Sequence, residues 1–251
     1  MSAGFSQQVE RHFHHGAAAY ARHARLQQAL AWRLVRAFHR LPLPPGATAD
    51  LGAGSGAVAQ ALQVLAPELL ERHPPLQVDL TAGLLAHNPL SQRQLLWNLN
   101  QGLPPQLQPA ALLTSNFALQ WLENPAAQLQ CWCQGLAPGG VLALAVPTAG
   151  SFPEWRRAAE HSGVPCTALP LPKVEALIAV AGQALDLQFC QRLRFSRPQS
   201  GLMLLRQMRA IGADASPAPS LSGGQLRRLL RHWPSAAVSW EVLLLVGRRR
   251  P

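Results

Sequence analysis

Residues 47–58 read ATADLGAGSGAV: a short apolar segment ends at Leu51 and runs directly into three glycines at alternate positions. The residues that follow, up to Leu70, have a helical pattern, and the succession of strand, glycine turn and helix is typical of a doubly wound α/β fold. Such a turn lets the backbone approach a ligand and points free helix N–H groups toward it. The spacing Gly52-x-Gly54-x-Gly56 departs from the dinucleotide-binding Gly-x-Gly-x-x-Gly, which would need a glycine in place of Ala57. A turn with a purely structural role is the alternative.

Four further segments read as strands, and their order along the chain predicts a parallel sheet. They cover residues 76–79, 94–97, 110–115 and 141–146. Segment 110–115 is a continuous run of small, mostly apolar residues, as expected of a parallel strand that is buried on both faces. Helices predicted over 57–70 and 126–136 lie between strands, where crossover helices belong.

Both ends of the chain add elements to this core. Residues 5–40 place apolar side chains at helical intervals, which predicts a helical segment with a break near Gly16 and a linker at 41–46. Beyond Pro147 the pattern predicts short helices over 155–161, 173–182, 201–211 and 222–232. It also predicts a strand near 186–195 and a closing strand over 237–246.

The composition excludes several classes of protein. Of the 251 residues 48% are hydrophobic and 14% are charged, which excludes a disordered chain. No apolar run reaches about 18 residues and no charged-then-apolar stretch opens the chain, so we expect neither a membrane span nor a signal peptide.

Cysteine and histidine residues show no metal-ligand spacing. We therefore interpret all four cysteines as reduced packing residues of a cytoplasmic protein; they are Cys131, Cys133, Cys166 and Cys190. The histidines at positions 12, 14 and 15 have neither acids nor cysteines at ligand spacing, and we expect them to be exposed helix residues rather than a metal site.

The net charge of +10 is distributed unevenly along the chain. Residues 1–40 carry a net charge of +5, residues 41–186 carry −4 and residues 187–251 carry +9. Basic ends of this kind form either a solvated face or a docking surface for nucleic acid, an acidic membrane or an acidic protein. Charge alone does not choose among these partners.

Residues 115–121 read SNFALQW and are similar to the Ser-Asn-x-Ala-x-Gln-Trp signature of the malonyl-[acyl-carrier protein] O-methyltransferases of biotin synthesis. Asp50 and the glycine turn likewise resemble the first motif of S-adenosylmethionine-dependent methyltransferases. Residues 205–213, LRQMRAIGA, resemble an element of the family that generic methyltransferases lack. Other stretches agree in order along nearly the whole chain: Phe13 with Tyr20 and Gln27, then 79–85, 136–140 and 148–154.

This resemblance implies a Rossmann-like class I methyltransferase fold of the α/β class. The sheet would be mostly parallel with an antiparallel last strand, a helical N-terminal cap and a helical insertion before the last strand. We expect one methyltransferase domain over 1–251. It would comprise the cap (1–44), the core that binds S-adenosylmethionine (45–148), and the substrate-side helices with the last strands (149–251).

The resemblance also implies S-adenosylmethionine as co-substrate, and no metal. The residues predicted to bind it are Asp50, Gly52, Gly54, Gly56, Asp79, Asn98 and Asn116. Asp79 follows the second strand, where an acid binds both ribose hydroxyls in adenosine sites; capping of the next helix is its alternative role. Asn98 stands where the family often has an acid, and it is the candidate for contact with adenine.

The implied reaction moves a methyl group to the free carboxylate of a malonyl thioester and yields the methyl ester that primes pimeloyl and biotin synthesis. A carboxylate with a pKa of about 4 is already ionised at neutral pH, so we name no catalytic acid or base. Arg206 and Arg209, three apart on one helix, are the first candidates for holding that carboxylate, with solvated side chains as the alternative. Tyr20 and Trp121 are predicted to bind substrate, with core packing as the alternative.

The implied partner is an acyl carrier protein, which is acidic and would dock on the basic ends of the chain. The candidate docking residues are Arg192, Arg194, Arg197, Arg227, Arg228 and Arg231. One alternative is a methyltransferase of the same fold acting on another small molecule or on RNA, against which the 205–213 element argues. The other is a basic nucleic-acid-binding protein without catalysis, which would carry more stacking aromatics in its basic segments. The sequence does not distinguish a carrier protein from coenzyme A, nor does it give the oligomeric state.

Overall fold

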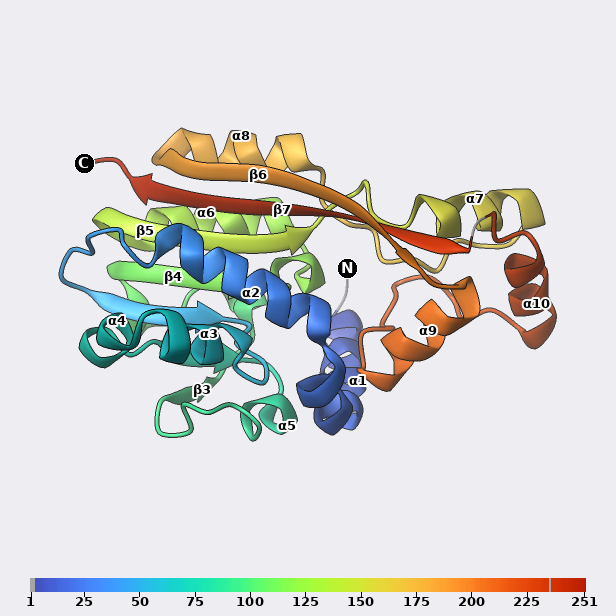
Figure 1. Cartoon of the computed structure of the whole chain (residues 1–251), viewed down its shortest axis with the longest axis horizontal. Coiled ribbons are helices and arrows are strands. Elements are labelled where there is room, and N and C mark those ends of the chain that lie inside the picture. The colour runs from blue at the N-terminus through green and yellow to red at the C-terminus, as the bar shows by residue number, and fades with distance from the viewer. Residues whose placement is uncertain (1–2, 235) are drawn as a thin grey trace.

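The computed structural model describes residues 3–234 and 236–251, and its centre is one seven-stranded sheet in the order β3-β2-β1-β4-β5-β7-β6 (Figure 1). The strands are β1 (Ala47–Leu51), β2 (Leu76–Asp79), β3 (Gln94–Leu96), β4 (Ala110–Asn116), β5 (Leu136–Pro147), β6 (Leu185–Pro198) and β7 (Ala237–Arg249). The helices of the first half are α1 (Ala3–His23), α2 (Arg25–Phe38), α3 (Ala57–Leu65), α4 (Pro67–Arg72) and α5 (Ala82–Leu85). Those of the second half are α6 (Pro125–Gly135), α7 (Pro153–Ser162), α8 (Val174–Ala184), α9 (Gly201–Ala210) and α10 (Gly223–Arg231).

The strand pairing confirms the predicted sheet. Strands β1 to β5 pair in parallel, and β7 is antiparallel to both β5 and β6. From β1 the chain moves outward through β2 to β3, then returns to place β4 on the other side of β1. In open sheets of this kind the ligand crevice lies beyond the carboxyl ends of the strands, at the point where the order reverses. The ends of β1, β2 and β4 are therefore the positions to inspect for a site.

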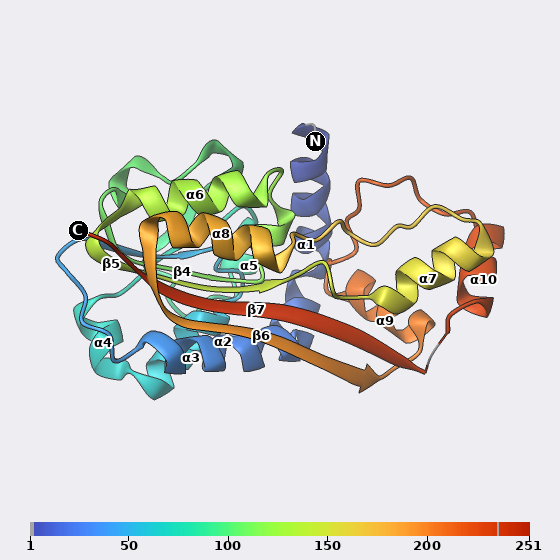
Figure 2. The ribbon, with the colours of Figure 1, turned by 90° about the horizontal axis from the view of Figure 1, so that it is seen from above.

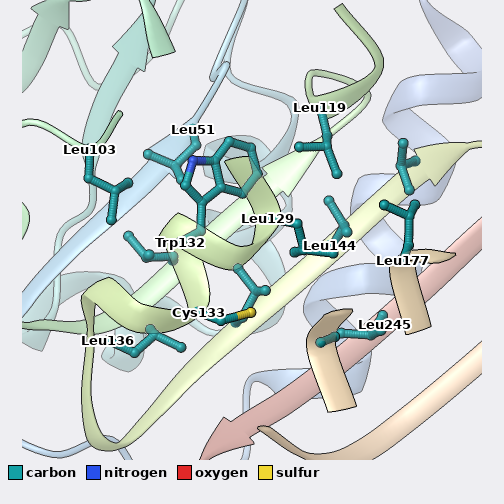
Figure 3. Close-up of a cluster of buried hydrophobic side chains, with 14 of the residues drawn as sticks. Leu51, Leu103, Leu119, Leu129, Trp132, Cys133, Leu136, Leu144, Leu177 and Leu245 are labelled. Carbon is teal, nitrogen blue, oxygen red and sulfur yellow. The ribbon is translucent and has the colours of Figure 1, made fainter. Parts of the chain in front are cut away.

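Helices cover both faces of the sheet, with α6 and α8 on one side and α2, α3 and α4 on the other (Figure 2). Successive residues of β5 point to opposite faces, so that Leu142 and Leu144 pack under α6 while Val141 and Ala143 pack under α2. Figure 3 shows the first of these cores, in which the fully buried Trp132 lies among leucine side chains. Burial on both faces explains the continuous apolar runs that mark β4 and β5 in the sequence.

The N-terminal helices break at a different residue from the one predicted. Helix α1 continues through Gly16 to His23, and the break falls at Ala24, whose φ and ψ are −74° and 50°. A Cβ on Gly16 would lie 2.5 Å from the backbone nitrogen of Gly212, which follows α9. The glycine therefore permits a close approach of two backbones instead of ending a helix.

A side-chain hydrogen bond joins the same two segments. His12 Nδ1 lies 2.7 Å from Asp214 Oδ1, so His12 has an acidic partner that sequence spacing did not reveal. His14 and His15 are exposed, as expected. Helix α1 is thus held across the turn after α9, at the end of the sheet (Figure 2).

Three other boundaries differ from the prediction. The helix expected over 57–70 is interrupted at Ala66, because Pro67 cannot donate a backbone hydrogen bond to the preceding turn and starts a new helix. Strand β5 begins at Leu136, five residues before the predicted start at 141. Strands β6 and β7 are longer than expected, and they pair with each other as far as Pro198 and Ala237, beyond the end of β5 (Figure 2).

A buried carboxylate anchors this long ribbon. Glu241 of β7, whose side chain is 3% exposed, accepts hydrogen bonds from Arg192 Nε (2.6 Å), Arg194 Nε (2.7 Å) and Thr148 Oγ1 (2.7 Å). Burial raises the pKa of Glu241, but the hydrogen bonds from the two arginines and Thr148 outweigh it and lower that pKa to about 2. Arg192 and Arg194, which the sequence offered for docking, are therefore engaged within the molecule.

The cysteines are all free, but only two of them fit the predicted packing role. Cys133 is buried and Cys131 is half-buried, whereas Cys166 and Cys190 are exposed, so the packing interpretation is wrong for this second pair. The described residues contain no cluster of three or more His, Cys, Asp or Glu side chains that could hold a metal ion. Within the same part of the chain, no helix combines the length and apolar character needed to cross a membrane.

Replacing Gly16 with alanine is expected to lower the free energy of unfolding by about 1–3 kcal/mol, because the 211–212 backbone must move away from the new methyl group. Gly182→Ala is the matched control: Gly182 also lies inside a helix, and a Cβ there would meet nothing within 4 Å. It should raise stability by about 0.5–1 kcal/mol through helix propensity. Urea unfolding followed by circular dichroism measures both; equal stabilities would contradict the close approach of α1.

Candidate active site

The glycine turn after β1 and the acid at the end of β2 are joined directly. Gly54 N donates to Asp79 Oδ2 and Thr81 N donates to Asp79 Oδ1, both at 2.8 Å. Gly52 and Gly56 adopt φ values of +70° and +80°, and a Cβ on Gly52 would lie 2.1 Å from the Cβ of Ala118. The turn therefore requires glycine both for its conformation and for its contact with the segment after β4. The expected proximity of Asp79 to the turn follows from the parallel pairing of β1 with β2.

Two buried acids lie at this point of the sheet. Asp50 is 1% exposed and accepts a hydrogen bond from Thr114 Oγ1 at 2.8 Å. Burial raises the pKa of Asp50 to about 7, against the hydrogen bond from Thr114, and the nearby charge of Asp79 raises it further. Burial also raises the pKa of Asp79, while the backbone N–H groups of Thr81 and Gly54 oppose that rise. Two neighbouring buried carboxylates favour a ligand that carries positive charge.

Asn116, at the end of β4, supplies an acceptor that lacks a partner. Its Nδ2 donates to the backbone oxygen of Gln27 at 3.0 Å, but its buried Oδ1 accepts no hydrogen bond from any described residue. Asn116 lines a small cavity with Asp50, Gly52 and Tyr20. Buried acceptors are almost always paired in folded proteins, so this oxygen indicates where a ligand would donate a hydrogen bond.

Asn98 lies on the other side of the turn. It lines a second small cavity together with Gly52, Asp79 and Phe13. Its Oδ1 already accepts from Asn100 N at 3.0 Å and from Asn100 Nδ2 at 3.1 Å. The amide Nδ2 of Asn98 is therefore the group that can donate to a ligand there.

A third cavity lies beyond Tyr20; it measures about 600 Å³ when the open solvent at its mouth is included, and seven of the side chains that line it are aromatic. The ring of Phe13 makes edge-to-face contacts with Tyr20 (centroids 5.7 Å apart) and Trp121 (5.2 Å), and Phe152 makes one with Trp240 (4.5 Å). We call this space the aromatic cavity. Tyr20 lines this cavity and also lines the small cavity of Asp50 and Asn116, which we call the acidic pocket. Its side chain therefore lies between the acidic pocket and the aromatic cavity.

Tyr20 remains protonated in this position. Burial raises the pKa of its hydroxyl above the ordinary value, and the negative charges of Asp79 and Asp50 raise it further. The hydroxyl is therefore a hydrogen-bond donor and not a base. Two other polar side chains that line the aromatic cavity have buried atoms without a partner among the described residues, Gln120 Oε1 and Trp155 Nε1.

The predicted site residues thus divide into two groups. Asp50, Asp79, Asn98 and Asn116 gather around the glycine turn, and Tyr20 and Trp121 line the adjoining aromatic cavity. Arg206 and Arg209 are exposed on α9 and line neither of these spaces; Met208 is the α9 residue that lines the aromatic cavity. Their predicted contact with a malonyl carboxylate stays a prediction that this arrangement does not support.

Sequence reasoning assigned no role to Gln27. Its side chain is 9% exposed, it lies on the buried face of α2, and it lines the aromatic cavity. A glutamine among Leu30, Leu34 and Phe38 at helical spacing was the available signal, because a buried amide needs a partner. Phe152 lies in the 148–154 stretch that resembles the family, but that resemblance gave it no role, and Trp155 of α7 lies outside the motifs quoted from the sequence.

Comparison with known proteins identifies relatives of this chain. No family model matches the chain. It is 32% identical over 261 residues to the malonyl-[acyl-carrier protein] O-methyltransferase of Alcanivorax borkumensis, an alignment that covers 96% of this chain and 86% of that protein. It is 29% identical to the protein of the same name from Methylococcus capsulatus, with 79% and 74% covered.

Solved structures show the same fold. The geranyl diphosphate C-methyltransferase of Streptomyces coelicolor, in complex with S-adenosyl-L-homocysteine, superposes with a TM-score of 0.52 at 14% identity. The match covers 90% of this chain and 80% of that one. The sheet is therefore the Rossmann-like sheet of class I methyltransferases. The match to the Alcanivorax protein, which covers 96% of this chain, identifies the family within that fold. The chain belongs to the malonyl-[acyl-carrier protein] O-methyltransferase family.

Proposed function

We propose that this protein transfers a methyl group from S-adenosylmethionine to the free carboxylate of malonyl-acyl carrier protein, the reaction for which its family is named. The observation that carries the proposal is the pair of buried acids and the unpartnered Asn116 Oδ1 around the glycine turn, next to an aromatic cavity. S-Adenosylmethionine carries a sulfonium and an ammonium group, so an acidic pocket with a free acceptor matches its charge.

The residues around the turn fit the parts of this co-substrate. Asn116 Oδ1 is suited to accept from the ammonium group, and the second lone pairs of the Asp79 carboxylate are suited to accept from the ribose hydroxyls. Asn98 Nδ2 is the donor available to an adenine nitrogen. Gly54 leaves room for the ligand to approach the backbone, because a Cβ there would meet no atom closer than 3.8 Å.

The chemistry requires little from acids and bases. S-Adenosylmethionine supplies an electrophilic methyl group on its sulfonium. One carboxylate oxygen of malonate forms the new bond to that methyl carbon as the carbon–sulfur bond breaks, and the electron pair of that bond stays on sulfur, which becomes the neutral thioether of S-adenosylhomocysteine. No proton moves, so the step requires no general base.

The chain therefore acts by orientation and by removing water. The aromatic side chains around the cavity reduce hydration of the carboxylate, which makes it a better nucleophile. Tyr20 stays protonated, and its hydroxyl can orient an acceptor at the boundary between the two pockets. Holding the reacting atoms in line and about 3 Å apart is the main source of rate in such a step.

The family supports an acyl carrier protein as the partner. An acyl carrier protein bears the malonyl group, and the three exposed arginines of α10 are available to an acidic docking face: Arg227, Arg228 and Arg231. Electrostatic docking of this kind mainly accelerates association and weakens with salt. A cytoplasmic location is consistent with this substrate.

The direct test is to incubate the purified protein with labelled S-adenosylmethionine and malonyl-acyl carrier protein. We expect a base-labile methyl ester on the malonyl group, detected by mass spectrometry, and no methylation of acetyl-acyl carrier protein, which lacks the free carboxylate. Methylation of neither substrate by a protein that still binds S-adenosylmethionine would contradict the proposed acceptor.

Replacing Asp50 with asparagine is expected to change the stability of the folded protein and its affinity for S-adenosylmethionine in opposite directions. Because the folded-state pKa of Asp50 is raised to about 7 from 3.8, its contribution to stability is fully present below pH 3.8 and is lost as pH rises through 7. An amide does not have to be ionised in the folded protein, so it avoids this loss of stability. The free energy of unfolding of ligand-free D50N should therefore exceed that of the wild type by at most about 4 kcal/mol at pH 8, and should not exceed it at pH 4.

Binding should change in the opposite direction. A cationic ligand favours ionised Asp50, so the affinity of the wild type for S-adenosylmethionine should rise between pH 5 and pH 8, while D50N should bind more weakly and with less dependence on pH. Urea unfolding and isothermal titration calorimetry measure the two effects. A D50N protein that binds as tightly as the wild type at pH 8 would remove Asp50 from the cofactor site.

A further inference from the structure

A second large cavity opens beside the aromatic one. It encloses about 1090 Å³, including its open mouth, and lies between the start of α2, the end of β6 and helix α9. Four residues line both spaces: Gln27, Met208, Ala213 and Trp240. The two cavities are therefore adjacent, and the buried Gln27 lies where they meet.

The mouth of this second cavity is positively charged. Arg25, the first residue of α2, and Arg197, near the end of β6, both line it and are both exposed. Neither side chain forms an ion pair or a hydrogen bond within the described part of the chain, and none of the described lining residues is acidic. The neighbouring arginines of β6 differ, since Arg192 and Arg194 both bind Glu241. Two unpaired guanidinium groups at one opening favour an anionic ligand, and their planar donor forks suit a phosphate.

Amide side chains also line this second cavity. Gln199 Nε2 donates to Gln207 Oε1 at 2.8 Å along the wall, and Gln27 lies where the two cavities meet. Arg25, Arg197 and Gln207 are exposed, Gln199 is half-buried and Gln27 is buried. The lining therefore changes inward from guanidinium groups and amides to one buried amide, next to the aromatic rings. A malonyl group carried on a phosphopantetheine arm has the complementary order: a phosphate, two amides, and a thioester that ends in the malonyl group.

We propose that this second cavity is the entrance for the phosphopantetheine arm of the malonyl thioester, with Arg25 and Arg197 binding its phosphate. The proposal rests on the proposed function, because it specifies how that substrate reaches the aromatic cavity. Gln27 is then a positioning residue for an amide or the thioester carbonyl of the arm. Both a carrier protein and coenzyme A present this phosphate, and the test compares them.

The test uses two short substrates that differ only in the phosphate, malonyl-phosphopantetheine and malonyl-pantetheine. The wild type should use the phosphorylated substrate with a kcat/KM higher by about tenfold or more, mainly through KM. Arg25→Gln combined with Arg197→Gln should abolish this preference and leave kcat/KM for malonyl-pantetheine within about twofold of the wild type. Arg36→Gln is the matched control, because Arg36 is exposed on the same helix and does not line this cavity.

A binding measurement keeps this test independent of the proposed reaction. Calorimetry with the protein saturated with S-adenosylhomocysteine should show tighter binding of phosphopantetheine than of pantetheine, and the double variant should lose the difference. If no malonyl thioester is methylated but this difference is found, the proposed function fails and the phosphate site stands. Equal binding of the two thiols by the wild type would overturn the site even if methylation is observed.

The natural carriers complete the comparison. The double variant should have a lower kcat/KM for both malonyl-acyl carrier protein and malonyl-coenzyme A, and the carrier with the higher wild-type kcat/KM is the natural source of the arm. If the double variant loses kcat/KM only for malonyl-acyl carrier protein and still binds phosphopantetheine as the wild type does, the arginines contact the surface of the carrier protein and the assignment is overturned. Thermal unfolding of each variant, expected within about 2 °C of the wild type for such surface changes, confirms that the fold is retained.

Discussion

The carboxylate of Asp79 connects the two strand ends on which the site depends. It accepts hydrogen bonds from the turn after β1 and from the start of the segment after β2, so it holds the glycine turn in an open form beside the reversal of strand order. Its burial is tolerated because both oxygens receive backbone N–H groups. Asp50 and the unpartnered oxygen of Asn116 then add negative character to the same point. The arrangement suits a positively charged ligand better than a neutral one.

Contacts between distant parts of the chain close the substrate side. Helix α1 lies against the turn after α9 because both backbones carry a glycine where they meet, and the His12–Asp214 pair joins the same segments. Tyr20 is thereby held between the acidic pocket and the aromatic cavity. This position gives one side chain contact with both the methyl donor and the methyl acceptor in the proposed reaction.

The arginines have different roles, although the sequence presents them as one basic population. Arg192 and Arg194 neutralise the buried Glu241 within the β6–β7 ribbon, and Glu241 also accepts a hydrogen bond from Thr148, in the segment after β5. Arg25 and Arg197 are unpaired at a cavity mouth, and the arginines of α10 face solvent. The net charge of the C-terminal region therefore overstates the positive charge that is free to bind a partner.

The sequence by itself determined the sheet and its ligand edge. Glycines at alternate positions, an acid after the second strand and continuous apolar runs are local consequences of a tight turn and of strands buried on both faces, so they can be read without coordinates. The 115–121 and 205–213 segments also indicated the family before any contact was known. Only the tertiary structure decided that Gly16 lies inside a helix, that His12 pairs with Asp214, and that Arg206 and Arg209 are exposed and line neither pocket. These outcomes depend on which side chains meet across separations of up to about two hundred residues, and neither periodicity nor charge along the chain specifies such meetings.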